Sequence, residues 1–91
     1  MARMTDTQYD AIAEAFPSYA GEVESLARAY HKSFKAEDST TYGVLYRQYI
    51  GGRLDGLAMG MMFAGACSDA QAFNDKALED AEKEVAEDVG T

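Results

Sequence analysis

The chain has no charged side chain from Gly56 to Cys67, a stretch that is rich in glycine, alanine and methionine. Such residues are uncommon in strands, and β-branched residues are almost absent after Ile50, so the pattern predicts a helix. We expect this helix to cover about residues 42–66, and its apolar part is shorter than the roughly 20 residues that a membrane span requires. A helix that is apolar on every side has to be covered on every side. We therefore expect it to be the buried, central helix of a small domain.

Two segments with helical spacing of apolar residues precede this one. The first is predicted to begin near Thr5, because Thr5 and Gln8 form a capping box. Its apolar stripe consists of Tyr9, Ile12, Ala13 and Phe16. Pro17 disfavours helical geometry at the residue before it, so it either kinks one helix or separates two. The second segment has the clearest helical spacing, with apolar positions at Tyr19, Val23, Leu26, Ala27, Tyr30 and Phe34.

A last helix is predicted after a turn near Cys67, where Ser68 and Gln71 form a second capping box. Its inward positions would be Ala70, Phe73, Ala77, Leu78, Ala81 and Val85. Its outward positions are mostly charged: Asp75, Lys76, Glu79, Asp80, Glu82, Lys83 and Glu87. The sequence therefore predicts an all-α fold, a small bundle of three to four helices that forms a single domain over residues 1–91.

Glycines recur every fourth residue along the central helix, at Gly52, Gly56 and Gly60, and Ala64 continues the row. Each glycine inside a helix costs about 1 kcal/mol relative to alanine, so three in register indicate the close approach of another backbone. The other half of this side carries Tyr42, Tyr46, Tyr49 and Arg53. An antiparallel second copy would place tyrosines over glycines, so we expect a homo-oligomer, with a dimer favoured. Alternatively, Tyr19, Tyr30 or Phe34 of the same chain fills the groove.

Composition narrows the possible partners. The 91 residues carry a formal net charge of −8, which argues against direct nucleic-acid binding and suits a partner with a basic surface. The single cysteine, Cys67, cannot form an intramolecular disulfide, which favours a reducing compartment. No signal peptide is predicted at the start of the chain. We therefore expect a cytoplasmic protein with no membrane partner.

The sequence contains no recognisable catalytic or metal-binding pattern, so we expect a protein without enzymatic activity or cofactor. His31 is the only histidine and has no cysteine or carboxylate cluster at ligand spacing around it. The second helical segment carries a basic face of Arg28, His31, Lys32 and Lys35. These side chains either interact with the end of their own helix or form an anion site for a nucleotide-like ligand.

The last helix carries most of the acidic excess. Asp75, Glu79, Glu82 and Glu87 are the candidate partner-binding residues. They either form an ordinary solvated surface or bind a basic groove in the way that nucleic-acid phosphates do. Lys76 and Lys83 interrupt the acidic series and favour the solvated surface.

In type, the chain resembles the short, acidic, helical accessory proteins of bacteriophages and mobile elements, such as inhibitors of CRISPR and other bacterial defence systems. Its size, the acidic helix over residues 75–88 and the hairpin GRLDGLAMGMMFAGACSDAQAF carry this resemblance. The resemblance implies a steric and electrostatic inhibitor of a defence or other nucleic-acid-handling complex in the host cytoplasm. Two alternatives remain: an oligomeric sponge for a small anion, and a structural or assembly component of a phage or host complex.

Overall fold

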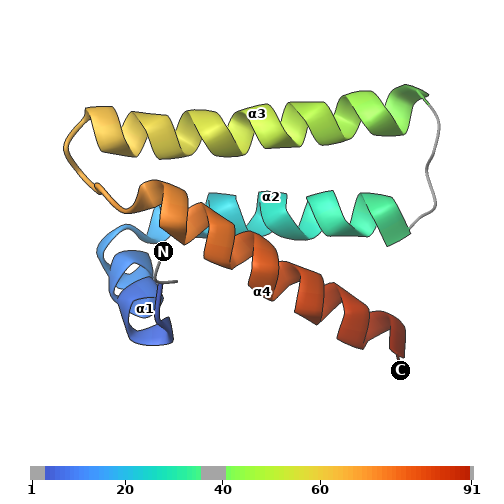
Figure 1. The fold of residues 1–91 in the computed structure, drawn as a ribbon, viewed down its shortest axis with the longest axis horizontal. Coiled ribbons are helices and arrows are strands. Elements are labelled where there is room, and N and C mark those ends of the chain that lie inside the picture. Colours follow the sequence, from blue (N-terminus) through green and yellow to red (C-terminus); the bar gives the residue numbers. More distant parts are fainter. Residues whose placement is uncertain (1–3, 36–40, 91) are drawn as a thin grey trace.

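The computed structural model describes residues 4–35 and 41–90, including their side chains except for residues 34, 35, 41, 42 and 87–90. These residues form four helices: α1 (Asp6–Ala15), α2 (Pro17–Lys35), α3 (Thr41–Phe63) and α4 (Ala70–Gly90) (Figure 1). The all-α class is confirmed. Within the described parts of the chain, no helix is both long enough and apolar enough to cross a membrane.

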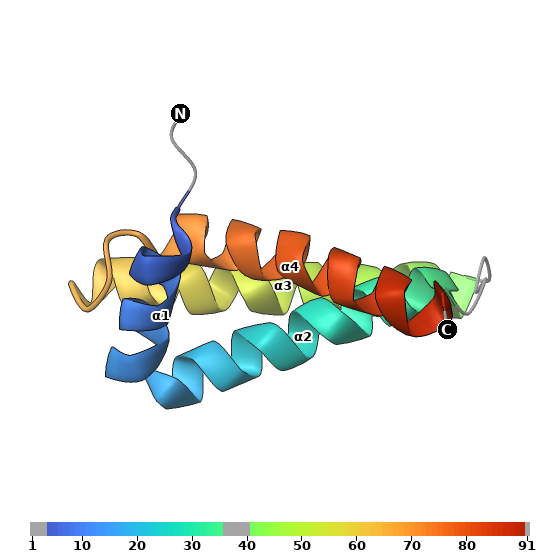
Figure 2. The ribbon, with the colours of Figure 1, turned by 90° about the horizontal axis from the view of Figure 1, so that it is seen from below.

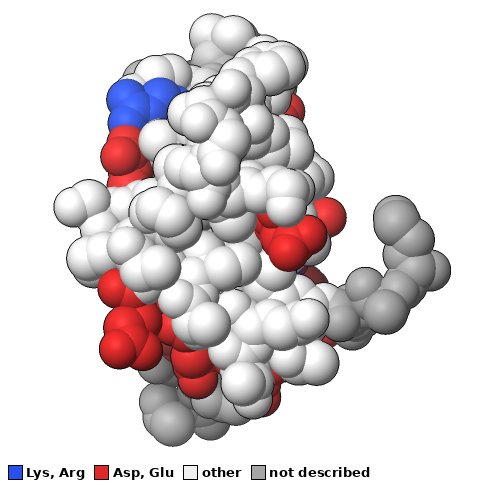
Figure 3. Space-filling view, turned by 90° about the vertical axis from the view of Figure 1, so that its left-hand side faces the viewer, with Lys and Arg blue, Asp and Glu red and all other residues white. Residues whose placement is uncertain are grey.

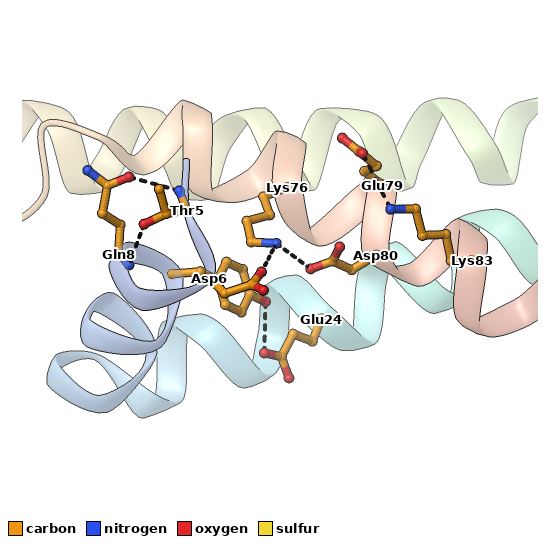
Figure 4. A network of polar contacts seen from close by, with 9 residues as sticks. Thr5, Asp6, Gln8, Glu24, Lys76, Glu79, Asp80 and Lys83 are labelled. Atoms are coloured by element: carbon orange, nitrogen blue, oxygen red, sulfur yellow. Dashed lines mark hydrogen bonds and ion pairs between the residues drawn. The ribbon is translucent and has the colours of Figure 1, made fainter. Parts of the chain in front are cut away.

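The first two helices are defined by local signals. The Thr5 side chain accepts a hydrogen bond from the backbone of Gln8 (3.1 Å), and the Gln8 side chain accepts one from the backbone of Thr5 (2.8 Å) (Figure 4). This confirms the predicted capping box. Phe16 leaves the helical region (φ −132°, ψ 67°), and Pro17 begins α2. Proline is favoured at a first helical position, where its missing N–H has no partner to lose. Pro17 therefore separates two helices.

The three long helices pack against one another, and α1 lies crosswise at the end of the bundle where α2 begins and α3 finishes (Figures 1 and 2). The contact between α2 and α4 is the most extensive, and α3 lies against both. The core therefore lies between α2, α3 and α4. Its fully enclosed side chains include Val23, Ala27, Ile50, Ala58 and Phe73.

Phe73 connects the crosswise helix to the rest of the core. Its ring stacks on Tyr9 of α1, with ring centroids 4.2 Å apart and planes 3° apart. Tyr19 of α2 contacts the same ring at 5.3 Å. The Tyr9 hydroxyl donates a 2.8 Å hydrogen bond to Glu24 of α2. Offset or tilted aromatic contacts stabilise a core beyond the area that they bury, so Phe73 holds α1 against α2 and α4.

A buried amide joins the three long helices. Asn74 of α4 is 1% exposed. Its Nδ2 donates to the carbonyl of Leu54 in α3 (2.7 Å), and its Oδ1 accepts from the Tyr19 hydroxyl in α2 (2.6 Å). A buried amide without these partners would be costly. Asn74 therefore fixes the position of α3 relative to α2 and α4.

The burial of α3 differs from the prediction. Within one chain, only one side of α3 is enclosed, with Ile50, Leu54 and Ala58 in the core. Gly56, Met59 and Met62 are exposed on other sides. The expected central helix, covered on every side, is therefore wrong for the single chain, because α2 and α4 both pack against the same side of α3.

The turn between α3 and α4 also differs in detail. Helix α3 ends at Phe63, and Gly65, two residues later, adopts a positive φ of 70°. The backbone of Gly65 donates to Met62 (3.1 Å) and that of Ala66 to Met61 (3.0 Å), the pattern of a Schellman motif. The chain reverses earlier than expected because glycine adopts this conformation without strain.

Helix α4 begins at Ala70 rather than at the predicted Ser68 capping box. The Gln71 side chain, which that box would turn towards Ser68, instead donates to Asp75 (3.1 Å). A side chain four residues ahead on the same helix is a near neighbour, so this hydrogen bond competes directly with the cap.

Replacing Asn74 with alanine should lower the free energy of unfolding by about 2–3 kcal/mol, because it leaves the buried Tyr19 hydroxyl without this acceptor and opens a cavity. Urea denaturation followed by circular dichroism measures the change. Gln71→Ala, on the exposed side of the same helix, should change stability by less than about 0.5 kcal/mol. Equal effects of the two substitutions would contradict the role of the buried amide.

The fold should lose stability in alkali. Burial raises the pKa of Tyr19 to about 12, with a smaller contribution from Cys67, and burial together with Glu24 also raises the pKa of Tyr9. A raised tyrosine pKa contributes stability below its ordinary value of 10.0, and that contribution is lost as the pH rises further. Denaturation at pH 9 to pH 12 should show a steeper fall for the wild type than for Tyr19→Phe.

Candidate functional site

The exposed apolar side chains are concentrated on one helix. The large hydrophobic residues that remain exposed among the described residues all belong to α3: Val44, Leu45, Tyr46, Tyr49, Met59, Met62 and Phe63. Phe63 is 82% exposed, and Leu45 and Tyr49 are each 58% exposed. We call the solvent side of α3 that carries these residues the outer face of α3. Scattered exposed apolar residues are normal, but a concentration on one face is typical of an interaction surface.

Glycines make the middle of the outer face of α3 flat. At Gly52, Gly56 and Gly60, an added Cβ atom would meet nothing within 4 Å. Of the aromatic side chains expected to fill this groove, Tyr19 and Tyr30 therefore do not do so, and the side chain of Phe34 lies outside the described residues. Tyr19 instead faces Asn74 in the core. Ala64, the expected end of the row, lies beyond the end of α3, in the turn.

A shallow groove runs along the middle of α3. It is lined by Gln48, Tyr49, Gly52, Arg53, Gly56 and Leu57. Arg53 forms an ion pair with Glu22 of α2 at the edge of this groove. That hydrogen-bonded pair raises the pKa of Arg53, and Tyr49 adds a weaker effect. Of the predicted packing residues, Tyr49, Gly52, Arg53 and Gly56 thus come together, whereas the side chain of Tyr42 lies outside the described residues.

Around the end of α3, a wide area lacks charged side chains (Figure 3). Acidic side chains lie at several margins of this area, and the basic side chains in view gather at one corner beside an acidic one. Apolar and charged surfaces are therefore separated on this end of the molecule.

The acidic face of α4, which we define by Asp75, Glu79 and Glu82, points away from the core. Asp75 and Glu82 are exposed, and Asp75 accepts its hydrogen bond from the neutral amide of Gln71. Glu79 forms an ion pair with Lys83 (3.7 Å) (Figure 4). The fourth predicted residue, Glu87, has its side chain outside the described part. Two of the four candidates thus project carboxylates that no described lysine or arginine pairs with.

Several basic side chains form ion pairs within the chain. Lys76 pairs with Asp6 of α1 (2.7 Å) and with Asp80 of its own helix (3.0 Å) (Figure 4). Hydrogen bonding from Lys76 lowers the pKa of Asp6, and Asp6 in turn is the main cause that raises the pKa of Lys76. These ion pairs join α1 to α4, so Lys76 does not offer its charge to an external anion.

Arg28 and His31 of the predicted basic face of α2 have partners within the chain. Arg28 pairs with Glu24 (3.8 Å) and Glu84 (3.4 Å) and lines a recess that also contains Asp80. Three carboxylates around one guanidinium group repel an anion rather than attract it. Lys32 is exposed, and the side chain of Lys35 lies outside the described residues.

His31 has a structural contact instead. Its Nε2 lies 2.8 Å from the carbonyl oxygen of Leu78 in α4. A carbonyl can only accept, so Nε2 donates. Helix α4 therefore covers the part of the basic face of α2 that carries His31. In the described parts of the chain, no three histidine, cysteine or acidic residues lie close enough to hold a metal ion.

Sequence reasoning missed Asn74. The residue lies four positions after Ala70 and three before Ala77, both of which were placed on the inward side of the last helix. That spacing was the available signal for its burial. The partners in α2 and α3 could not be found in this way, because they depend on how the helices are arranged.

Comparisons with known proteins give no relative: no family model, curated protein or solved structure matches this chain.

The Asp6–Lys76 pair should be visible in an acid titration. We expect the carboxyl of Asp6, followed by NMR, to titrate below its ordinary pKa of 3.8 because Lys76 stabilises the ionised form. A lowered carboxyl pKa contributes stability that is present above the ordinary value and is lost as the pH falls through the folded value. Lys76→Met should return the pKa of Asp6 towards 3.8, whereas Lys32→Met should leave it unchanged.

Proposed function

We propose that this protein is a non-catalytic binding protein that acts by occupying a basic surface of a partner. The observation that supports this best is the acidic face of α4, where Asp75 and Glu82 project into solvent without a described basic neighbour bound to them. The formal net charge of −8 adds a long-range attraction in the same direction. Electrostatic attraction of this kind chiefly speeds association and selects oppositely charged partners.

Several basic residues already form ion pairs within the chain, and this strengthens the proposal. Arg28, Arg53, Lys76 and Lys83 each pair with carboxylates of the same molecule. The acidic groups that remain are therefore not locally neutralised. A negatively charged surface attracts proteins that hold phosphates with lysine and arginine. These side chains bind carboxylates by the same charge-assisted hydrogen bonds.

Among such partners, we propose a bacterial defence complex, such as a CRISPR effector, or another nucleic-acid-handling complex. The protein would occupy the basic channel that otherwise holds nucleic acid and would exclude it sterically, as a small phage-encoded inhibitor in the host cytoplasm. The size and helical composition that the chain shares with this class of accessory protein support the proposal.

A second candidate function, a structural or assembly component, is favoured by the outer face of α3. Apolar side chains as exposed as Phe63 and Tyr49 are suited to permanent contact with another protein surface. This function would use α3 rather than α4. The anion-sponge alternative loses support, because the carboxylates of Glu24 and Glu84 already hold Arg28.

The test is inhibition of target-DNA binding by purified CRISPR effector complexes, measured by gel shift across a panel of effector types. We expect inhibition that weakens as salt is raised, because surface charges are screened. The double variant Asp75→Lys, Glu82→Lys should inhibit about tenfold less well, since two exposed charge pairs at about 0.7 kcal/mol each amount to that factor.

The matched control is Asp10→Lys, Glu14→Lys, which changes the net charge equally but on exposed positions of α1. This control should inhibit almost as well as the wild type. If both double variants lost inhibition equally, net charge rather than α4 would be responsible. Absence of inhibition throughout the panel would refute the assignment to these complexes.

A further inference from the structure

The outer face of α3 contains a regular seam. Alternating steps of four and three residues connect Leu45, Tyr49, Gly52, Gly56, Met59 and Phe63, which we call the α3 seam. All six are exposed. The same spacing characterises the contact positions of two helices packed along their length. The residues of α3 that face the core, Ile50, Leu54 and Ala58, lie on the other side of the helix. Helix α3 therefore has two apolar sides, and only one of them is covered within the chain.

Residue sizes along the α3 seam are symmetric about Leu54. Gly52 and Gly56 lie equally far from Leu54, as do Tyr49 and Met59, and then Leu45 and Phe63. The seam is therefore flat in the middle and bulky towards both ends. A second identical helix, crossing at the glycines, meets glycine with glycine in both a parallel and an antiparallel arrangement.

We propose that a second copy of this chain covers the α3 seam, with the two α3 helices closest at Gly52 and Gly56. A two-fold interface brings the same surface of both copies together, and the symmetric spacing of the seam allows its glycines to meet there. None of the six seam residues is charged, and the two charged residues beside its glycines, Arg53 and Asp55, have opposite signs. The proposal uses α3 and is independent of the function proposed for α4.

The seam extends along most of α3. From Leu45 to Phe63 the helix extends over about 27 Å at about 1.5 Å per residue. The exposed side chains of Val44, Tyr46 and Met62 widen this strip on its two flanks. A specific interface usually covers about 800 Å² on each partner, and the outer face of α3 is the described surface on which large apolar side chains are concentrated for such a contact.

The glycines themselves distinguish a dimer from a monomer. In a single chain, a side chain at Gly56 meets nothing, so a larger residue there should improve helix stability and cause no clash. In the proposed dimer, the same residue prevents the close approach of the two backbones. The two states therefore predict opposite consequences of filling this position.

The experiment is analytical ultracentrifugation of the full chain between 1 and about 100 μM, the range in which moderate affinities are resolved. We expect the wild type to be a dimer and Gly56→Leu to associate at least tenfold more weakly while remaining folded by circular dichroism. Phe63→Ser, which removes the most exposed seam side chain, should also weaken association.

The control is Gly21→Leu, because Gly21 is an exposed helical glycine of α2 whose added Cβ would also meet nothing within 4 Å. This variant should associate as the wild type does. A monomeric wild type at the highest concentration would overturn the proposal. A dimer that Gly56→Leu leaves intact would overturn it as well, because that dimer would use another surface.

Discussion

The position of α3 depends on a single buried amide. Apolar residues occur on every side of α3, so its own sequence gives little reason to bury one side rather than another. Asn74 donates to the Leu54 carbonyl and accepts from the Tyr19 hydroxyl, and so links α3 to α4 and α2. Turning or sliding α3 would break the hydrogen bond to Leu54 inside the core, where water cannot replace it. The side of α3 that this arrangement leaves uncovered is the one that carries the α3 seam.

The molecule consequently presents two surfaces with different physical properties. The outer face of α3 is apolar, so it can stabilise a complex only through direct contact with a surface of matching shape. The acidic face of α4 acts over about 8–10 Å at physiological salt, and its influence falls as salt rises. Because the surfaces belong to different helices, one can join two copies while the other remains available to a basic partner.

Ion pairs within the chain produce this separation. Lys76 holds α1 to α4 through Asp6, and Arg53 holds α3 to α2 through Glu22. Each pair is exposed, so its direct contribution to stability is small. These pairs place basic side chains at the contacts between helices, whereas the carboxylates of Asp75 and Glu82 remain exposed. In the same way, α4 supplies a partner to Arg28 and to His31 of the predicted basic face.

The sequence by itself determined the features that depend on neighbours along the chain. The Thr5–Gln8 cap, the break before Pro17 and the inward positions of α4, such as Phe73 and Ala77, follow from local hydrogen bonding and helical spacing. Tertiary structure alone decided which side of α3 is buried, that His31 meets α4, and that Asn74 has partners in two other helices. The reason is physical: a helix that is apolar all round buries whichever side its neighbours reach, and a buried polar group is satisfied by atoms distant in sequence.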